Sequence, residues 1–262
     1  MNPTPEIKKE AKTPASTVYE IISYEGLEEM GRPLQSLAWS ALVAGFLISF
    51  CLLCEAILKL YLPEGGSSFL IYNLGYSVGF VLVIIGRFQL FTENTITPIL
   101  PVYDDFTRAN IMKTARLWGV VITLNFIGAF LMAFLISFSP YVSDEMMGLM
   151  VSISEHAISN DFAKVFLLAV PAGFLIACLV WLIPSAKEGK IFLIFLVTYM
   201  IAVLDFAHVV AGSTEAFLLV LEGHIEVVDA ASFLVAATLG NVFGGTCLFA
   251  LVAYAQVQKE LD

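Results

Sequence analysis

Charged residues are scarce in this chain: they make up 14% of its 262 residues, whereas 59% are hydrophobic. A soluble domain of ordinary composition carries about 25% charged residues. The shortage of charge excludes an ordinary soluble protein and indicates a chain that is solvated largely by lipid. Basic residues are the rarer kind, with 13 Lys and Arg against 23 Asp and Glu. This excludes the basic patch that a nucleic-acid-binding surface needs.

The sequence also lacks the short motifs of common enzymes. It contains no glycine-rich phosphate loop that ends in Lys-Ser or Lys-Thr, no Gly-x-Ser-x-Gly turn and no His-Glu-x-x-His pattern. The four cysteines lie inside apolar stretches, without a second pair or a histidine nearby to complete a metal site. We therefore expect no enzymatic activity, no cofactor and no metal.

Long apolar runs dominate what is present. A helix needs about twenty apolar residues to cross the hydrocarbon core of a bilayer. Runs of this kind predict six spans, at residues 38–60, 69–102, 113–138, 162–183, 191–222 and 230–257. We therefore predict an all-α membrane protein with a six-span domain over 38–257, a tail over 1–37 and a short tail over 258–262. Within the first tail, residues 15–37 have loosely helical apolar spacing and predict an amphipathic interfacial helix.

The distribution of basic residues predicts how the spans are oriented. Ten of the thirteen Lys and Arg fall in the tails and loops of one side, only Lys59 and Lys164 fall on the other, and Arg87 lies within a span. Cytoplasmic loops carry the excess of basic residues in membrane proteins. We therefore expect both termini in the cytoplasm and the acidic loops outside.

Two of the predicted spans are interrupted by polar residues, the second at residues 86–94 and the fifth at residues 205–215. Irregular backbone survives at membrane depth only where it is buried in protein or lines a cavity. Interrupted spans at corresponding places in two halves indicate a solute path near the bilayer midplane. Since the middle span of each half is the broken one, we predict an inverted structural repeat and a transport protein.

His208 is the sharpest candidate for chemistry, because it is the only histidine within a predicted span. An ionisable group at that depth is costly and marks a functional site, and imidazole exchanges a proton near physiological pH. A neutral histidine that only closes a gap between helices is an equal alternative. Thr92 offers a hydroxyl that would meet His208 if the interruptions face each other. It would also serve to cap the helix that restarts after the break.

Arg87, Glu93 and Asp205 put charges beside the interruptions. A lone arginine at the centre of a span costs about 2.5–3.5 kcal/mol, so Arg87 should have a partner. We expect a structural clamp with Glu93 or Asp205, and keep a binding site for a permeating anion as the alternative. Glu215 is a fourth charge beside the breaks, and Glu55, deep in the first span, is a further partner candidate without an assigned role.

Apolar side chains near the interruptions would form constrictions that exclude hydrated ions, although each one alone fits helix packing as well. They are Tyr76, Phe80, Leu90, Phe91, Ile176 and Ile201.

Three short motifs resemble the formate/nitrite transporter family: Leu90-Phe91-Thr92, Phe206-x-His208 and Gly240-Asn241-x-x-Gly244-Gly245. The resemblance covers roughly residues 35–257. It implies an aquaporin-like fold that assembles as a homopentamer in the lipid bilayer, with one pore in each protomer for a small monovalent anion. It also implies roles for single residues: His208 as the central pore histidine with Thr92 facing it, Leu90 and Phe91 as gating residues, and Tyr76 and Phe80 as constriction residues.

The chain departs from that family at several positions. By this resemblance, counting back from Trp181, the family's vestibule lysine falls on Ala157, and the glutamate before the central histidine falls on Ala207. Pore-lining asparagines fall on Gly173 and Gly212, and a constriction phenylalanine falls on Ile201. We expect a channel of the bacterial inner membrane for small weak-acid anions, or their neutral acids, of the size of formate. A pH-independent facilitator of a small neutral solute and a non-conducting membrane scaffold remain alternatives.

Overall fold

The computed structural model describes residues 13–63 and 65–260, and this part of the chain is built from helices without a strand. Residues 1–12 and 261–262, which belong to the two predicted tails, lie outside the described residues. In chain order the α-helices are α2 (Ala15–Gly31), α3 (Leu34–Ile48), α4 (Phe50–Tyr61), α5 (Gly66–Tyr72), α6 (Tyr76–Ile85), α7 (Ile99–Asp104), α8 (Arg108–Ser137), α9 (Asp144–Ile158), α10 (Phe162–Leu182), α11 (Lys190–Val203), α12 (Val209–Leu221), α13 (Val227–Val242) and α14 (Leu251–Val257). Short helical turns, including the π-helical segment η5 (Phe243–Ala250), join several of them.

In the described part of the chain, five helical segments are long and apolar enough to cross a membrane. They run over Leu34–Tyr61, Gly66–Ile85, Arg108–Ser137, Phe162–Ser185 and Val227–Val257. The stretch predicted as the fifth span is divided between α11 and α12, each too short for that test. The all-α membrane class is thus confirmed, whereas the count of six spans stays a prediction.

Both predicted interruptions are places where regular helix stops. α6 ends at Ile85 and the next α-helix begins only at Ile99, while α11 ends at Val203 and α12 begins at Val209. Shortly after each end, one residue adopts a left-handed backbone: Arg87 with φ 54° and Asp205 with φ 53°. Residues other than glycine rarely adopt this conformation. Helices α6 and α11, one in each half of the chain, are therefore followed by the same kind of backbone turn.

The amphipathic helix near the N-terminus is shorter than predicted. α2 ends at Gly31 because Arg32 precedes Pro33 and adopts an extended conformation, with φ −60° and ψ 140°. The first long span then starts at Leu34 instead of residue 38. α2 buries Val18, Ile22 and Met30 on one face, which is the spacing expected for a helix docked against protein.

The segment predicted as an acidic outer loop contains a helix, α9. The Ser143 hydroxyl accepts a hydrogen bond from the backbone N–H of Met146, and Asp144 and Glu145 occupy the first turn. A hydroxyl cap followed by acids is the usual start signal of a helix. Met146 and Met150 are buried one turn apart, so the segment is anchored by apolar contacts despite its charge.

Close helix packing depends on glycine at two corresponding contacts. A Cβ atom on Gly128 of α8 would lie 2.2 Å from the carbonyl oxygen of Leu42 in α3. A Cβ atom on Gly244 would lie 1.9 Å from the carbonyl oxygen of Val170 in α10. Small residues let membrane helices approach this closely.

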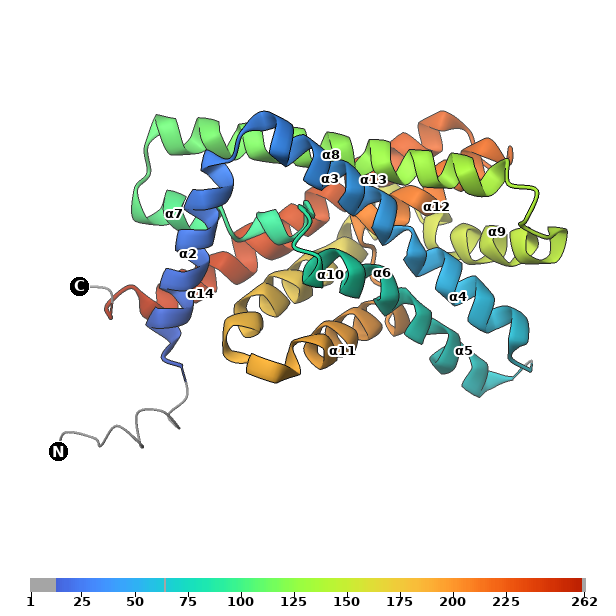
Figure 1. Cartoon of the computed structure of the whole chain (residues 1–262), viewed down its shortest axis with the longest axis horizontal. Coiled ribbons are helices and arrows are strands. Elements are labelled where there is room, and N and C mark those ends of the chain that lie inside the picture. The colour runs from blue at the N-terminus through green and yellow to red at the C-terminus, as the bar shows by residue number, and fades with distance from the viewer. Residues whose placement is uncertain (1–12, 64, 261–262) are drawn as a thin grey trace.

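Figure 1 shows α2 and α14 at one end of the molecule and α5 and α9 at the opposite end. α2 and α14 also contact each other. The segments nearest the two ends of the chain thus lie on one side of the protein. This is the arrangement that the predicted orientation requires, but which side faces the cytoplasm stays a prediction.

Candidate transport site

His208 and Thr92 meet in the middle of the protein. The Thr92 Oγ1 atom lies 2.7 Å from His208 Nε2, and the exposed fractions of the two residues are 0% and 2%. Thr92 comes from the interruption after α6 and His208 from the interruption before α12. The structure therefore brings together the two residues that the sequence placed in different halves of the chain.

Hydrogen bonding fixes the tautomer of His208. The residue caps α12, and its Nδ1 atom accepts a hydrogen bond of 3.2 Å from the backbone N–H of Ala211. A neutral imidazole carries one proton, which must then be on Nε2 and point at Thr92 Oγ1. Thr92 accepts that bond, so its own hydroxyl hydrogen is left to donate to another group.

Asn125 and Asn241 hold the two interruptions in place with matching hydrogen bonds. The Asn125 amide accepts from Phe91 N at 2.9 Å and donates to the carbonyl oxygens of Ala41 at 2.8 Å and Gln89 at 3.0 Å. The Asn241 amide accepts from Val209 N at 2.9 Å and donates to the carbonyl oxygens of Ala169 at 2.8 Å and Ala207 at 3.0 Å. Both asparagines are fully buried. They satisfy the backbone groups that the missing helical turns leave unpaired.

A cavity of about 770 Å³ leads to His208 from the side of α5 and α9. Four of the predicted pore residues line it: Tyr76, Ile201, His208 and Gly212. Its lining also contains the basic side chains of Lys59, Lys164 and His156, beside Ala157. We call this cavity the vestibule.

The remaining predicted pore residues lie deeper than the vestibule or pack elsewhere. Phe80 packs edge-on against the His208 ring, with ring centroids 4.9 Å apart. Phe91 packs against Trp118, and Gly173 lies against the backbone of Asn241. Leu90 and Ile176 are fully buried in the same apolar core as Phe80 and Phe91. None of these five residues lines the vestibule, and Phe80, Leu90, Phe91 and Ile176 belong to the buried apolar core.

The structure does not form the predicted clamp of Arg87, Glu93 and Asp205. The Arg87 guanidinium is exposed and pairs with Glu25 of α2 at 3.4 Å. Asp205 instead lies 3.3 Å from His156, and both side chains are more than half exposed. The left-handed turns at Arg87 and Asp205 direct the two side chains outward, each to an exposed partner.

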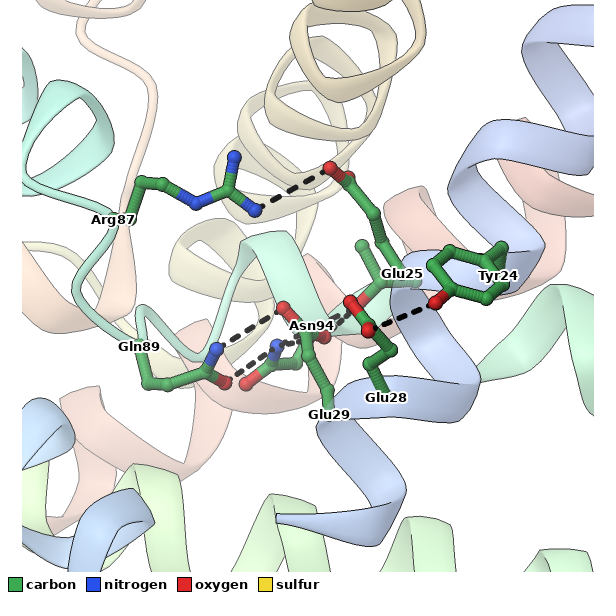
Figure 2. A network of polar contacts seen from close by, with 8 residues as sticks. Tyr24, Glu25, Glu28, Glu29, Arg87, Gln89 and Asn94 are labelled. Atoms are coloured by element: carbon green, nitrogen blue, oxygen red, sulfur yellow. Dashed lines mark hydrogen bonds and ion pairs between the residues drawn. The ribbon is translucent and has the colours of Figure 1, made fainter.

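Figure 2 shows that α2 is attached to the first interruption through its acidic side chains. The Glu29 carboxylate accepts hydrogen bonds from Gln89 Nε2 at 3.0 Å, Asn94 Nδ2 at 3.0 Å and Thr97 Oγ1 at 2.5 Å. Burial raises the pKa of Glu29 above its ordinary value, although the bonds from Thr97 and Gln89 oppose that shift. α2 thereby holds the loop that carries Thr92.

Several residues of this region were not predicted as site residues. In the sequence, Lys59 and Lys164 indicate only the orientation of the spans. The signal that distinguishes them is that they are the only basic residues on the predicted outer side. Glu25 and Glu29 lie on an amphipathic helix whose position cannot be read from local sequence. Their contacts with the first interruption follow only from the docking of α2 against it.

Comparison with known proteins places the chain in a family. A sequence profile described as formate/nitrite transporter matches residues 16–255. The inner membrane protein YfdC of Escherichia coli (strain K12) is 38% identical, over 95% of this chain and 80% of that protein. The formate channel BtFdhC of Bacillus thuringiensis is 24% identical, over 93% of this chain and 95% of that protein.

Solved structures share the fold. An FNT family ion channel superposes with a TM-score of 0.82 at 17% identity, covering 92% of this chain and 99% of that one. A pentameric formate channel with formate bound superposes with a TM-score of 0.70 at 20% identity, covering 87% of this chain and 98% of that one. Because the profile match spans nearly the whole chain, the protein belongs to the formate/nitrite transporter family.

Proposed function

We propose that the protein is a channel for small monovalent weak-acid anions, or their neutral acids, of the size of formate. Membership of the family supports this, together with a relative named as a formate channel and a similar structure that contains formate. The observation that carries the proposal is the contact between Thr92 and His208 at the inner end of the vestibule.

The geometry of Thr92 and His208 supports a way in which they would bind a solute. Because His208 Nε2–H donates to Thr92, the Thr92 hydroxyl hydrogen is available for an oxygen of a passing acid. Among the described residues, no other hydrogen bond reaches that hydroxyl. Beyond it lie apolar side chains, where a bare anion loses its hydration and a neutral acid avoids most of that cost. We therefore expect the neutral acid to be the species that crosses.

Lys59 and Lys164 would supply the attraction that the family's lysine would give at Ala157. Lysine side chains at a cavity raise the local concentration of anions, and here they share the lining with Glu55, Asp205 and Glu215. We further propose a homopentamer in the bacterial inner membrane, with both termini in the cytoplasm. The name of the relative YfdC supports that location and the solved pentameric channel supports the assembly.

Reconstitution into liposomes tests the proposal. Purified protein should pass formate, acetate or nitrite faster at acidic than at alkaline pH, because the neutral acid is more abundant at low pH. Chloride serves as the control, since it has no neutral acid at these pH values. Flux of urea that does not depend on pH would favour the neutral-solute facilitator instead. Absence of flux for every short carboxylic acid, nitrite and hydrosulfide would refute the proposal.

A further inference from the structure

Two buried glutamates face the vestibule from opposite helices. Glu55 of α4 and Glu215 of α12 both line the cavity, together with His208, and their exposed fractions are 4% and 6%. Ser49 at the start of α4 and Thr214 of α12 join these helices through a contact of 2.7 Å between their hydroxyls. The two carboxyls are thus held on two walls of one cavity.

Neither carboxyl has a partner among residues 13–63 and 65–260. The three ion pairs of the described residues involve other acids: Glu25, Asp205 and Glu155. No hydrogen bond to the side chain of Glu55 or Glu215 is present in that part of the chain. The missing side chain of Gly212 leaves room for Glu215, whose Oε2 atom lies 3.7 Å from where a Cβ atom of Gly212 would be. Glu215 therefore leans along α12 toward the end of the helix that carries His208.

The ionisable groups around the pair do not neutralise both acids. Other ionisable side chains line the same cavity: the bases Lys59 of α4, His156 of α9 and Lys164 of α10, the acid Asp205, and Tyr72, Tyr76 and His208. Cys51 of α4 adds a buried thiol one turn from Glu55. The Lys59 ammonium lies over the Tyr72 ring, 5.5 Å from the centroid, and His156 pairs with Asp205. In the described part of the chain none of these groups forms an ion pair with Glu55 or Glu215.

An isolated ionised carboxylate is very costly away from water, and two like charges that share one site disfavour each other. We propose that Glu55 and Glu215 together hold a proton in the vestibule and transfer it to a weak-acid anion before the anion reaches His208. This rests on the proposed function. It adds the proton donor and implies selection of weak-acid anions over anions of strong acids.

The transfer balances as a simple acid–base step. The O–H bond of the protonated glutamate breaks as an O–H bond forms on an oxygen of the anion, which becomes the neutral acid. The glutamate is left as a carboxylate and takes a proton back from water at the mouth of the vestibule. Lys59 and Lys164 at the same cavity would gather the anions that enter this step.

Replacing the carboxyls by amides tests the proposal, because the size is kept and the proton is lost. Formate flux into liposomes should be measured for the wild type, Glu55→Gln, Glu215→Gln and the double variant, well above the pKa of formic acid. We expect flux to fall about tenfold or more in the double variant. Flux in Glu215→Asp, which keeps both carboxyls, should lie closer to the wild-type value. Glu145→Gln, at an exposed acid of α9 that does not line the vestibule, is the matched control.

The opposite result has a clear meaning. If both glutamates were ionised and simply repelled anions, the amide variants would pass formate faster, and an increase or no change would overturn the proposal. Infrared spectroscopy gives a readout that needs no transport: the carbonyl stretch of protonated carboxyls should be present at neutral pH and should be weaker in the double variant by the share of Glu55 and Glu215. A wild-type protein that shows this band but passes no weak acid refutes the proposed function, whereas a band missing from the wild type refutes the proton site.

Discussion

Asn125 and Asn241 occupy equivalent places in the two halves of the protein, and each holds one helix interruption through three hydrogen bonds to backbone groups. Gln89 and Phe91, bound by Asn125, flank Leu90. Ala207 and Val209, bound by Asn241, flank His208. The position of His208 is therefore set by a side chain of another helix.

Replacing either asparagine by alanine should destabilise the protein strongly. Each substitution leaves one buried N–H and two buried carbonyl oxygens without this partner, and an unsatisfied buried group costs about 1–3 kcal/mol. We expect the free energy of unfolding in detergent to fall by roughly 3 kcal/mol or more for Asn125→Ala and for Asn241→Ala. Asn110→Ala, at an amide whose hydrogen bonds are exposed, is the control. A loss no larger than the control's would show that the asparagines do not hold the interruptions.

Arg87 should tolerate substitution, contrary to what a buried clamp requires. Its pair with Glu25 is exposed, and such pairs are worth about 0–1 kcal/mol. Its left-handed backbone costs a residue with a Cβ atom about 1–2 kcal/mol. Arg87→Gly should therefore be at least as stable as the wild type and more stable than Arg87→Ala, as measured by thermal unfolding. A loss of about 3 kcal/mol or more in both variants would instead indicate a broken buried charge pair.

The raised pKa of Glu29 gives stability a dependence on pH. A carboxyl with a higher pKa in the folded state binds more protons when folded. Its contribution to stability is therefore complete below the unfolded pKa of about 4.3 and declines as pH rises through the raised folded value. The stability of the wild type relative to Glu29→Gln should fall over this range. Glu20→Gln, which replaces an exposed acid of the same helix, is the control; a rise with pH for Glu29 would contradict the assignment.

The Thr92 hydroxyl is predicted to act on the solute, beyond its contact with His208. Thr92→Val keeps the shape of the side chain but removes the hydroxyl, whereas Thr92→Ser keeps it. We expect formate flux in liposomes to fall about tenfold or more in Thr92→Val and to stay close to the wild-type value in Thr92→Ser. Equal flux in the two variants would show that the hydroxyl does not act on the solute.

Much of this arrangement follows from local sequence. The apolar runs locate the helices within a few residues, since the length needed to cross a bilayer is fixed. The polar residues at 86–94 and 205–215 mark where regular helix stops, but the second interruption is shorter than predicted, because α12 is helical again from Val209. The contact of Thr92 with His208 follows once the two interruptions are expected to face each other.

The rest depends on contacts between distant segments. Arg87 pairs with Glu25 because α2 docks against the first interruption, and no local pattern gives the position of a helix outside the spans. The acidic residues at the start of α9 favour a loop in the sequence, although Ser143 and the two acids after it are an ordinary helix start. Glu55 and Glu215 are recognisable in the sequence as charges near the interruptions, but only the fold places both on one cavity.

Replacing His208 by asparagine tests whether this histidine serves weak-acid transport. Asparagine keeps an acceptor for the Ala211 N–H at the start of α12, so the helix cap should survive, but it cannot exchange a proton in the physiological range. Formate flux should be measured against pH for both proteins in liposomes. The variant should fold normally and lose most of the formate flux; flux at the wild-type level in His208→Asn would contradict this role of the histidine.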